Sequence, residues 1–231
     1  MRQRSYTFPM DDLRPANLSW QSFDEFVSFL FDRNVPKDSE ESEPWYYAFS
    51  CGDFEFDPDP VCDYYIQLFS RPEALLGRFS RDQLEQGFWA IQGPNLACSV
   101  YRLLFNNDLR FERKIECISS MFGLFSNLFS VEPLDTSASM WWDALCYDWH
   151  CGNRRRERGG EDADLQDAFF KVLSRILLLD STFCQGAALH GLGHLHHPDT
   201  KGLISQYIQQ RPSLPKELQE YALAAGEFKV M

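Results

Sequence analysis

Three histidines in the C-terminal part of the chain, His190, His194 and His197, have residue types and spacing that could support metal chemistry. On a helix they fall at positions i, i+4 and i+7, so that one face would present three imidazoles. Neutral imidazole nitrogens one turn apart can converge on zinc. The alternative is structural: His190 packs at a helix–helix contact, and His194, His196 and His197 line an exposed helix end. The sequence favours this second interpretation, with no metal and no other cofactor.

Cysteine and histidine also occur together around Cys146, His150 and Cys151, with Cys184 as a further candidate in space. A zinc site or a nucleophilic Cys–His pair is conceivable there, but the spacing matches no standard zinc motif. With seven Cys and five His in the chain, such neighbours are expected by chance. Buried free thiols in a reducing cytosol explain the cysteines better. The sequence therefore leaves enzymatic activity open and favours its absence.

An acidic, aromatic segment near the N-terminus is the candidate surface for a protein partner. It runs from residue 38 to residue 63 and contains many carboxylates but no Lys or Arg. Its aromatic side chains could pack inward beneath an acidic surface. In the functional interpretation they are binding anchors, while the carboxylates steer a basic partner. The candidate partner-binding residues are Trp45, Tyr46, Tyr47, Asp53, Glu55, Asp57 and Asp59.

Composition narrows the class of protein. The chain has 231 residues with 44% hydrophobic side chains, enough to form a core and to exclude wholesale disorder. Its formal net charge of −12 disfavours binding to the phosphate backbone of nucleic acids. The N-terminus has no apolar signal segment, and the apolar runs are too short to cross a membrane. We expect a cytoplasmic protein without a membrane or nucleic-acid partner. Its oligomeric state stays open.

The elements that must position these residues are almost all helical. We predict one helical domain over residues 1–231, with an irregular lead-in at 1–17 and the acidic, aromatic insertion at 34–60. That insertion includes either a hairpin around Cys51–Asp53 or an ordered loop. Apolar spacing predicts helices over 18–33, 61–70, 72–78, 81–92, 94–105, 109–130, 137–149, 163–180, 182–195, 199–211 and 215–226.

Several residues indicate how these helices begin and pack. Ser80 and Gln83 form a capping-box pattern, Pro94 fits a first helical position, and Asp162 or Asp164 can cap the helix that follows. Gly191 and Gly193 would permit close helix crossing. Trp142 and Trp149 share one helical face and suit core packing, with an exposed interaction site as the alternative. The basic cluster of residues 154–158 is either a solvated face or a clamp for an acidic group.

The segment Leu192-Gly-His-Leu-His-His-Pro198, followed by a second apolar helix, resembles the HEAT-like bacterial repeat. His196 and His197 stand where that turn usually has Gly and Asp. This resemblance implies HEAT-like helices over 163–226. The order of Phe79–Trp89, Met140–Trp142 and Cys184–Gly193 also resembles an uncharacterised family of bacterial cytoplasmic helical proteins. The fold expected is all-α, an irregular antiparallel helix stack of the α-α superhelix type.

For function, stacked helices favour a non-enzymatic protein–protein interaction module. One version is an immunity-like protein that neutralises a basic partner. The first alternative is a metal-dependent enzyme that uses His190 and His194. The second is a structural scaffold or self-associating protein.

Overall fold

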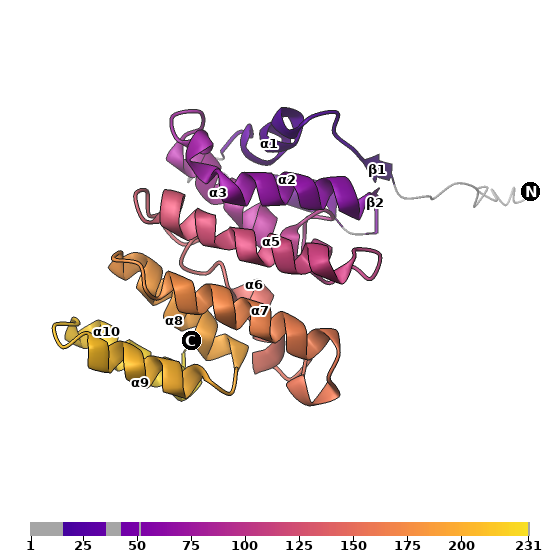
Figure 1. Ribbon diagram of the computed structural model, residues 1–231. Helices are drawn as coiled ribbons and strands as arrows, with labels where there is room; N and C mark the ends of the chain where they lie inside the picture. Colours follow the sequence, from indigo (N-terminus) through magenta and orange to yellow (C-terminus); the bar gives the residue numbers. More distant parts are fainter. Residues whose placement is uncertain (1–15, 36–42, 51, 231) are drawn as a thin grey trace, which may run out of the picture.

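The computed structural model describes residues 16–35, 43–50 and 52–230, and it confirms an all-α fold (Figure 1). The α-helices are α1 (Phe23–Phe31), α2 (Pro58–Ser70), α3 (Arg81–Gln92), α4 (Val100–Leu104), α5 (Phe111–Gly123), α6 (Asp143–His150), α7 (Glu161–Ile176), α8 (Thr182–Leu195), α9 (Thr200–Gln210) and α10 (Lys216–Gly226). Short 3-10 helices are η1 (Trp45–Phe49), η2 (Pro72–Leu75) and η4 (Arg156–Arg158), and η3 (Leu124–Phe129) is a π-helical continuation of α5.

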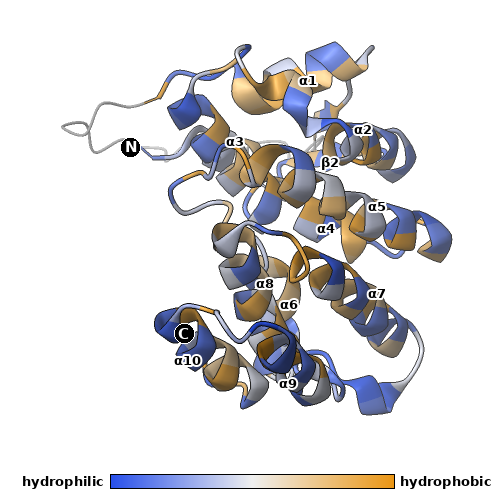
Figure 2. Cartoon of the chain, turned by 60° about the vertical axis from the view of Figure 1, so that its left-hand side comes forward, coloured by the Kyte–Doolittle hydropathy of each residue, from blue (hydrophilic) through white to orange (hydrophobic). Residues whose placement is uncertain are grey.

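The helices form a stack that follows the order of the sequence. In Figure 1 the stack runs from α1 at the top to α9 and α10 at the bottom. Helix α2 contacts α5, α5 contacts α7, and α7 contacts α8, so that each layer covers the apolar face of the one before it. Hydrophobic and hydrophilic residues alternate along these helices (Figure 2), as expected for helices that bury one face.

Helix boundaries agree with the sequence where a side chain caps the first turn. The predicted helices 81–92 and 182–195 are α3 and α8, and Ser80 with Gln83 forms the expected capping box. The predicted helix 94–105 is wrong at its start. Helix α4 begins at Val100, because the Ser99 hydroxyl accepts a hydrogen bond from the backbone N–H of Arg102, and Pro94 lies outside it.

The cap proposed for α7 is also wrong. Helix α7 begins after Gly160, and none of the described side chains caps it. Asp162 lies inside its first turn and accepts a hydrogen bond at 2.8 Å from Nη1 of Arg154. A carboxylate in the first turn is still favourable beside the positive end of the helix dipole.

The small sheet near the N-terminus is not the hairpin that is one of the two expectations for Cys51–Asp53, of which Cys51 lies outside the described residues. Strand β2 (Phe54–Phe56) pairs in parallel with β1 (Ala16–Leu18), and Ala16 lies opposite Phe54. The lead-in predicted at 1–17 therefore ends in a strand, while residues 1–15 lie outside the described part of the chain. The first helix begins at Phe23 rather than at residue 18, because the Ser22 hydroxyl accepts from the N–H of Glu25.

The tryptophans of the segment around α6 lie in the core, as the sequence favours. Trp142 is fully buried, stacked on Phe125 at a ring-centroid distance of 5.5 Å and edge-on to Phe169 at 6.2 Å. Trp149 is also buried and contacts Phe169. These contacts hold α6 rigidly against η3 and α7.

Glu85 of α3 fixes the start of the loop that leads into α6. Its carboxylate accepts hydrogen bonds of 2.8–2.9 Å from the backbone N–H and hydroxyl groups of Thr136 and Ser137. Burial raises the pKa of Glu85, but these four hydrogen bonds together lower it by more than burial raises it. The pKa of Glu85 therefore lies below its ordinary value. The ionised carboxylate of Glu85 thus stabilises the start of this loop.

Glu85→Gln is expected to lower the free energy of unfolding by about 2 kcal/mol at neutral pH, since the amide cannot accept all four bonds. Because the folded-state pKa is depressed, the stabilisation is complete above the ordinary pKa of Glu and is lost as pH falls through the folded value. Urea unfolding of both proteins from pH 7 to pH 3 tests this expectation. A stability difference that did not shrink in acid would contradict it.

Candidate metal centre

Helix α8 carries the central histidines and is buried on almost every side. It contacts α6, α7 and α10, and its small residues allow these helices to approach closely. A Cβ atom on Gly191 would lie 2.7 Å from the Trp142 ring, and one on Gly193 would lie 2.3 Å from Val230. The expected close helix crossing is confirmed at Gly191, whereas Gly193 makes room for the C-terminal segment.

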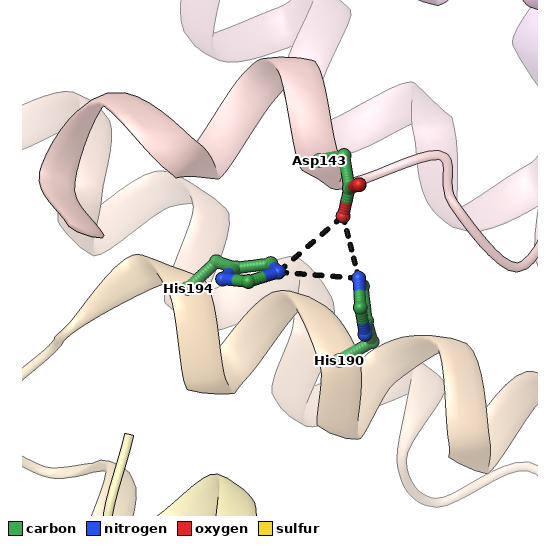
Figure 3. Close-up of side chains that lie close together, drawn as sticks. All are labelled: Asp143, His190 and His194. Atoms are coloured by element: carbon green, nitrogen blue, oxygen red, sulfur yellow. Dashed lines mark hydrogen bonds and ion pairs between the residues drawn. The ribbon is translucent and has the colours of Figure 1, made fainter. Parts of the chain in front are cut away.

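Two histidines of α8 converge with one carboxylate of α6 (Figure 3). Nε2 of His190 lies 2.5 Å from Oδ1 of Asp143, and Nε2 of His194 lies 3.4 Å from the same oxygen. The two Nε2 atoms are 3.2 Å apart. All three atoms are potential metal ligands, and they lie close enough together to bind one ion. Because α6 lies along α8, its first residue meets two successive turns of that helix.

The spacing of this Asp143–His190–His194 cluster fits a transition-metal ion. Ligands about 2.05 Å from a tetrahedral zinc ion are separated from one another by about 3.3 Å. Both distances to His194 already have this value, and only the contact between Asp143 and His190 must open. The Asp143 side chain is 35% exposed and can make this movement, while the imidazoles of His190 and His194 are 6% and 4% exposed.

The ring nitrogen of His190 that does not face the cluster has a hydrogen-bond partner, as is normal for metal-binding histidines. Nδ1 of His190 lies 2.6 Å from the Tyr221 hydroxyl of α10, which leaves Nε2 to face the cluster. Burial, together with the nearby Asp143 carboxylate, raises the pKa of Tyr221 to about 12, so that the hydroxyl stays protonated at neutral pH. The second ring nitrogen of His190 is therefore held in place by a neutral partner.

His194 is neutral in this environment. Burial lowers its pKa to about 4, and the neighbouring His190 contributes in the same direction. A neutral imidazole is the form that binds metal ions. Its Nδ1 atom is buried and has no hydrogen-bond partner among the described residues. The orientation of His194 is thus set by packing, including edge contacts with Tyr147 and His150.

The expectation of three imidazoles on one helical face is wrong for His197. Helix α8 ends at Leu195, and His196 takes a left-handed conformation that turns the chain. His197 instead stacks on Phe170 and places Nε2 2.9 Å from Oδ1 of Asp167 in α7. The third member of the cluster is Asp143, which no sequence pattern indicates, because a single Asp far from the histidines in the chain carries no local signal.

The proposed cysteine–histidine sites do not form within the described residues. Cys146 is buried, Sγ of Cys184 contacts the carbonyl oxygen of Phe125, and Cys151 is exposed. His150 contacts His196 instead, with Nδ1 3.1 Å from Nε2. Burial raises the pKa of the Cys146 and Cys184 thiols, so that both stay protonated at neutral pH, which disfavours a nucleophilic role.

A cleft of about 350 Å³ lies beside His190 and Tyr221. Apolar side chains such as Met140 and Phe183 line it, and Ser139 and Thr182 also contribute to its wall. Among the described residues, its lining includes no Lys, Arg, Asp or Glu. A cleft of this kind suits a small uncharged group.

Most of the candidate partner-binding residues have structural partners in the described part of the chain. Trp45 packs on Phe29 and lies under the Arg33 guanidinium. Asp57 caps α2 and Asp53 accepts from the Ser50 hydroxyl. All the carboxylates among these candidates, and Tyr47, are nevertheless exposed, whereas Trp45 and Tyr46 are half-buried. Partner binding by this segment therefore stays a prediction.

The basic cluster is engaged within the chain. Arg154 pairs with Asp162 and lies over the Phe105 ring, and Arg156 pairs with Asp167. These contacts tie the loop before α7 to its neighbours. They leave less free positive charge for an acidic partner than the sequence indicates.

No protein-family model, curated protein or solved structure matches this chain. The resemblance to HEAT-like repeats therefore stays a prediction. Among the described helices, none has both the length and the apolar character needed to cross a membrane.

Proposed function

We propose that this protein is a metal-dependent enzyme whose Asp143, His190 and His194 bind one divalent transition-metal ion, zinc first. The observation that carries this proposal is the convergence of three ligand atoms from two helices. Two histidines and one carboxylate are a frequent ligand set for catalytic zinc and for non-haem iron. The function extends the interpretation of His190 and His194 that the sequence left as an alternative.

Three protein ligands favour a catalytic role over a structural one. Structural zinc sites are usually closed by four protein ligands, whereas catalytic sites keep one position open. Here the partly exposed Asp143 leaves one side of the cluster accessible. Bound zinc would supply Lewis-acid chemistry of the kind used in hydrolysis. The uncharged cleft beside His190 and Tyr221 supports a substrate with a small neutral group.

The test is zinc binding by the full chain, measured by elemental analysis and by competition with a chromogenic chelator. We expect one tightly held zinc ion per chain, and affinity that falls on the order of 100-fold or more in Asp143→Asn and His194→Gln. His197→Gln is the matched control, because it removes a buried histidine of the same segment outside the cluster. Equal zinc affinity in His194→Gln and His197→Gln would overturn the proposal.

A further inference from the structure

A second pair of imidazoles lies next to the proposed centre. His150 ends α6 and His196 follows α8, and Nδ1 of His150 is 3.1 Å from Nε2 of His196. The His150 ring also contacts that of His194 at a centroid distance of 5.1 Å. Four imidazoles thus form a row, in which His190 and His194 belong to the first centre.

Aromatic stacking fixes both rings of the second pair. Tyr147 lies on His150 with a centroid distance of 5.1 Å and an interplanar angle of 16°. Phe228 lies on His196 at 4.4 Å and 25°. The two facing nitrogens are therefore held in position before any metal ion binds. This lowers the entropic cost of binding.

One residue of this pair, His196, has a left-handed backbone conformation. His196 and Phe228 have φ values of 54° and 58°, and they are the two non-glycine residues with positive φ in the described part of the chain. A helix end with this conformation normally has Gly or Asn. An imidazole that is held there and stacked on the other strained residue indicates a function for its side chain. A hydrogen bond between two half-buried histidines would not require that backbone.

We propose that His150 and His196 form a second metal site, for a borderline transition-metal cation of the Cu²⁺ class. Two imidazole nitrogens about 2.0 Å from one ion and 3.1 Å from each other subtend an angle on the order of 100°. This is near the angle between adjacent ligands in tetragonal copper sites. Imidazole suits copper, and Cu²⁺ binds most tightly in the divalent first-row series. Both residues are half-buried, so that solvent can reach the site.

The experiment is a Cu²⁺ titration of the full chain, followed by electron paramagnetic resonance. It is performed in a Cys151→Ser background, because that exposed thiol would react with copper. We expect two copper ions per chain, and one after His196→Asn, with loss of the nitrogen hyperfine pattern of the second site. Asn is chosen because it tolerates the left-handed conformation.

Two further variants separate this site from the first centre. Asp143→Asn combined with His194→Gln should leave the copper ion that depends on His196, even if the first centre binds no metal at all. His150→Gln should weaken that same ion at least about tenfold, since one of two protein ligands is lost. His197→Gln should have no effect. Copper stoichiometry and spectrum unchanged by His196→Asn would overturn the proposal.

Discussion

Saturating zinc is expected to raise the free energy of unfolding of the wild-type protein by about 4 kcal/mol when free zinc is 1,000 times its Kd. The three ligand atoms converge only in the folded chain, because Asp143 and His190 come from different helices. Zinc should therefore bind the native state with strong preference. For a chain of this length the increase corresponds to a rise in Tm on the order of 10 °C. Differential scanning calorimetry at several zinc concentrations measures it.

The unfolded chain complicates this measurement, and His194→Gln is the control that removes the complication. Seven cysteines become available to zinc on unfolding, which reduces the net stabilisation. His194→Gln keeps all seven, so binding to the unfolded state is similar in both proteins. The difference between them reports the native site. If zinc raised the Tm of both proteins equally, the Asp143–His190–His194 cluster would not be the place where it acts.

The sequence predicts local structure well where local interactions determine it. Helix α3 starts where the Ser80 and Gln83 capping box requires, and α8 coincides with its predicted range. Helix α4 is shorter than its apolar pattern, because the pattern does not distinguish helix from the turns that precede Ser99. The parallel pairing of β1 with β2 joins distant segments, and no short-range signal specifies such a pair.

The candidate site shows the same division between local and distant information. The spacing of His190 and His194 predicts that their imidazoles lie together, and the structure confirms it. His197 does not lie on that face, because the helix ends at Leu195 and His196 turns the chain in a left-handed conformation. Asp143 is part of the cluster because α6 packs along α8. This contact is between segments far apart in the sequence. Tertiary packing therefore decides which carboxylate completes the cluster.

The same packing makes Gly191→Ala the substitution with the largest expected effect on stability. The added methyl carbon would lie 2.7 Å from the Trp142 ring and 2.8 Å from Leu173. Trp142 cannot move aside, since it is fully buried between Phe125 and Phe169. We expect α8 to shift away from α6, with a loss of about 3 kcal/mol in the free energy of unfolding.

Gly186→Ala is the matched control on the same helix. A Cβ atom there has no neighbour within 4 Å in the described part of the chain, so alanine should stabilise α8 by about 1 kcal/mol through its higher helix propensity. Identical substitutions five residues apart are thus expected to have opposite signs in urea unfolding. Because the shift of α8 would separate His190 from Asp143, Gly191→Ala should also weaken zinc binding, while Gly186→Ala should not. If both variants lowered the free energy of unfolding equally, the close contact at Gly191 would not be the cause, and helix packing there would not hold the site together.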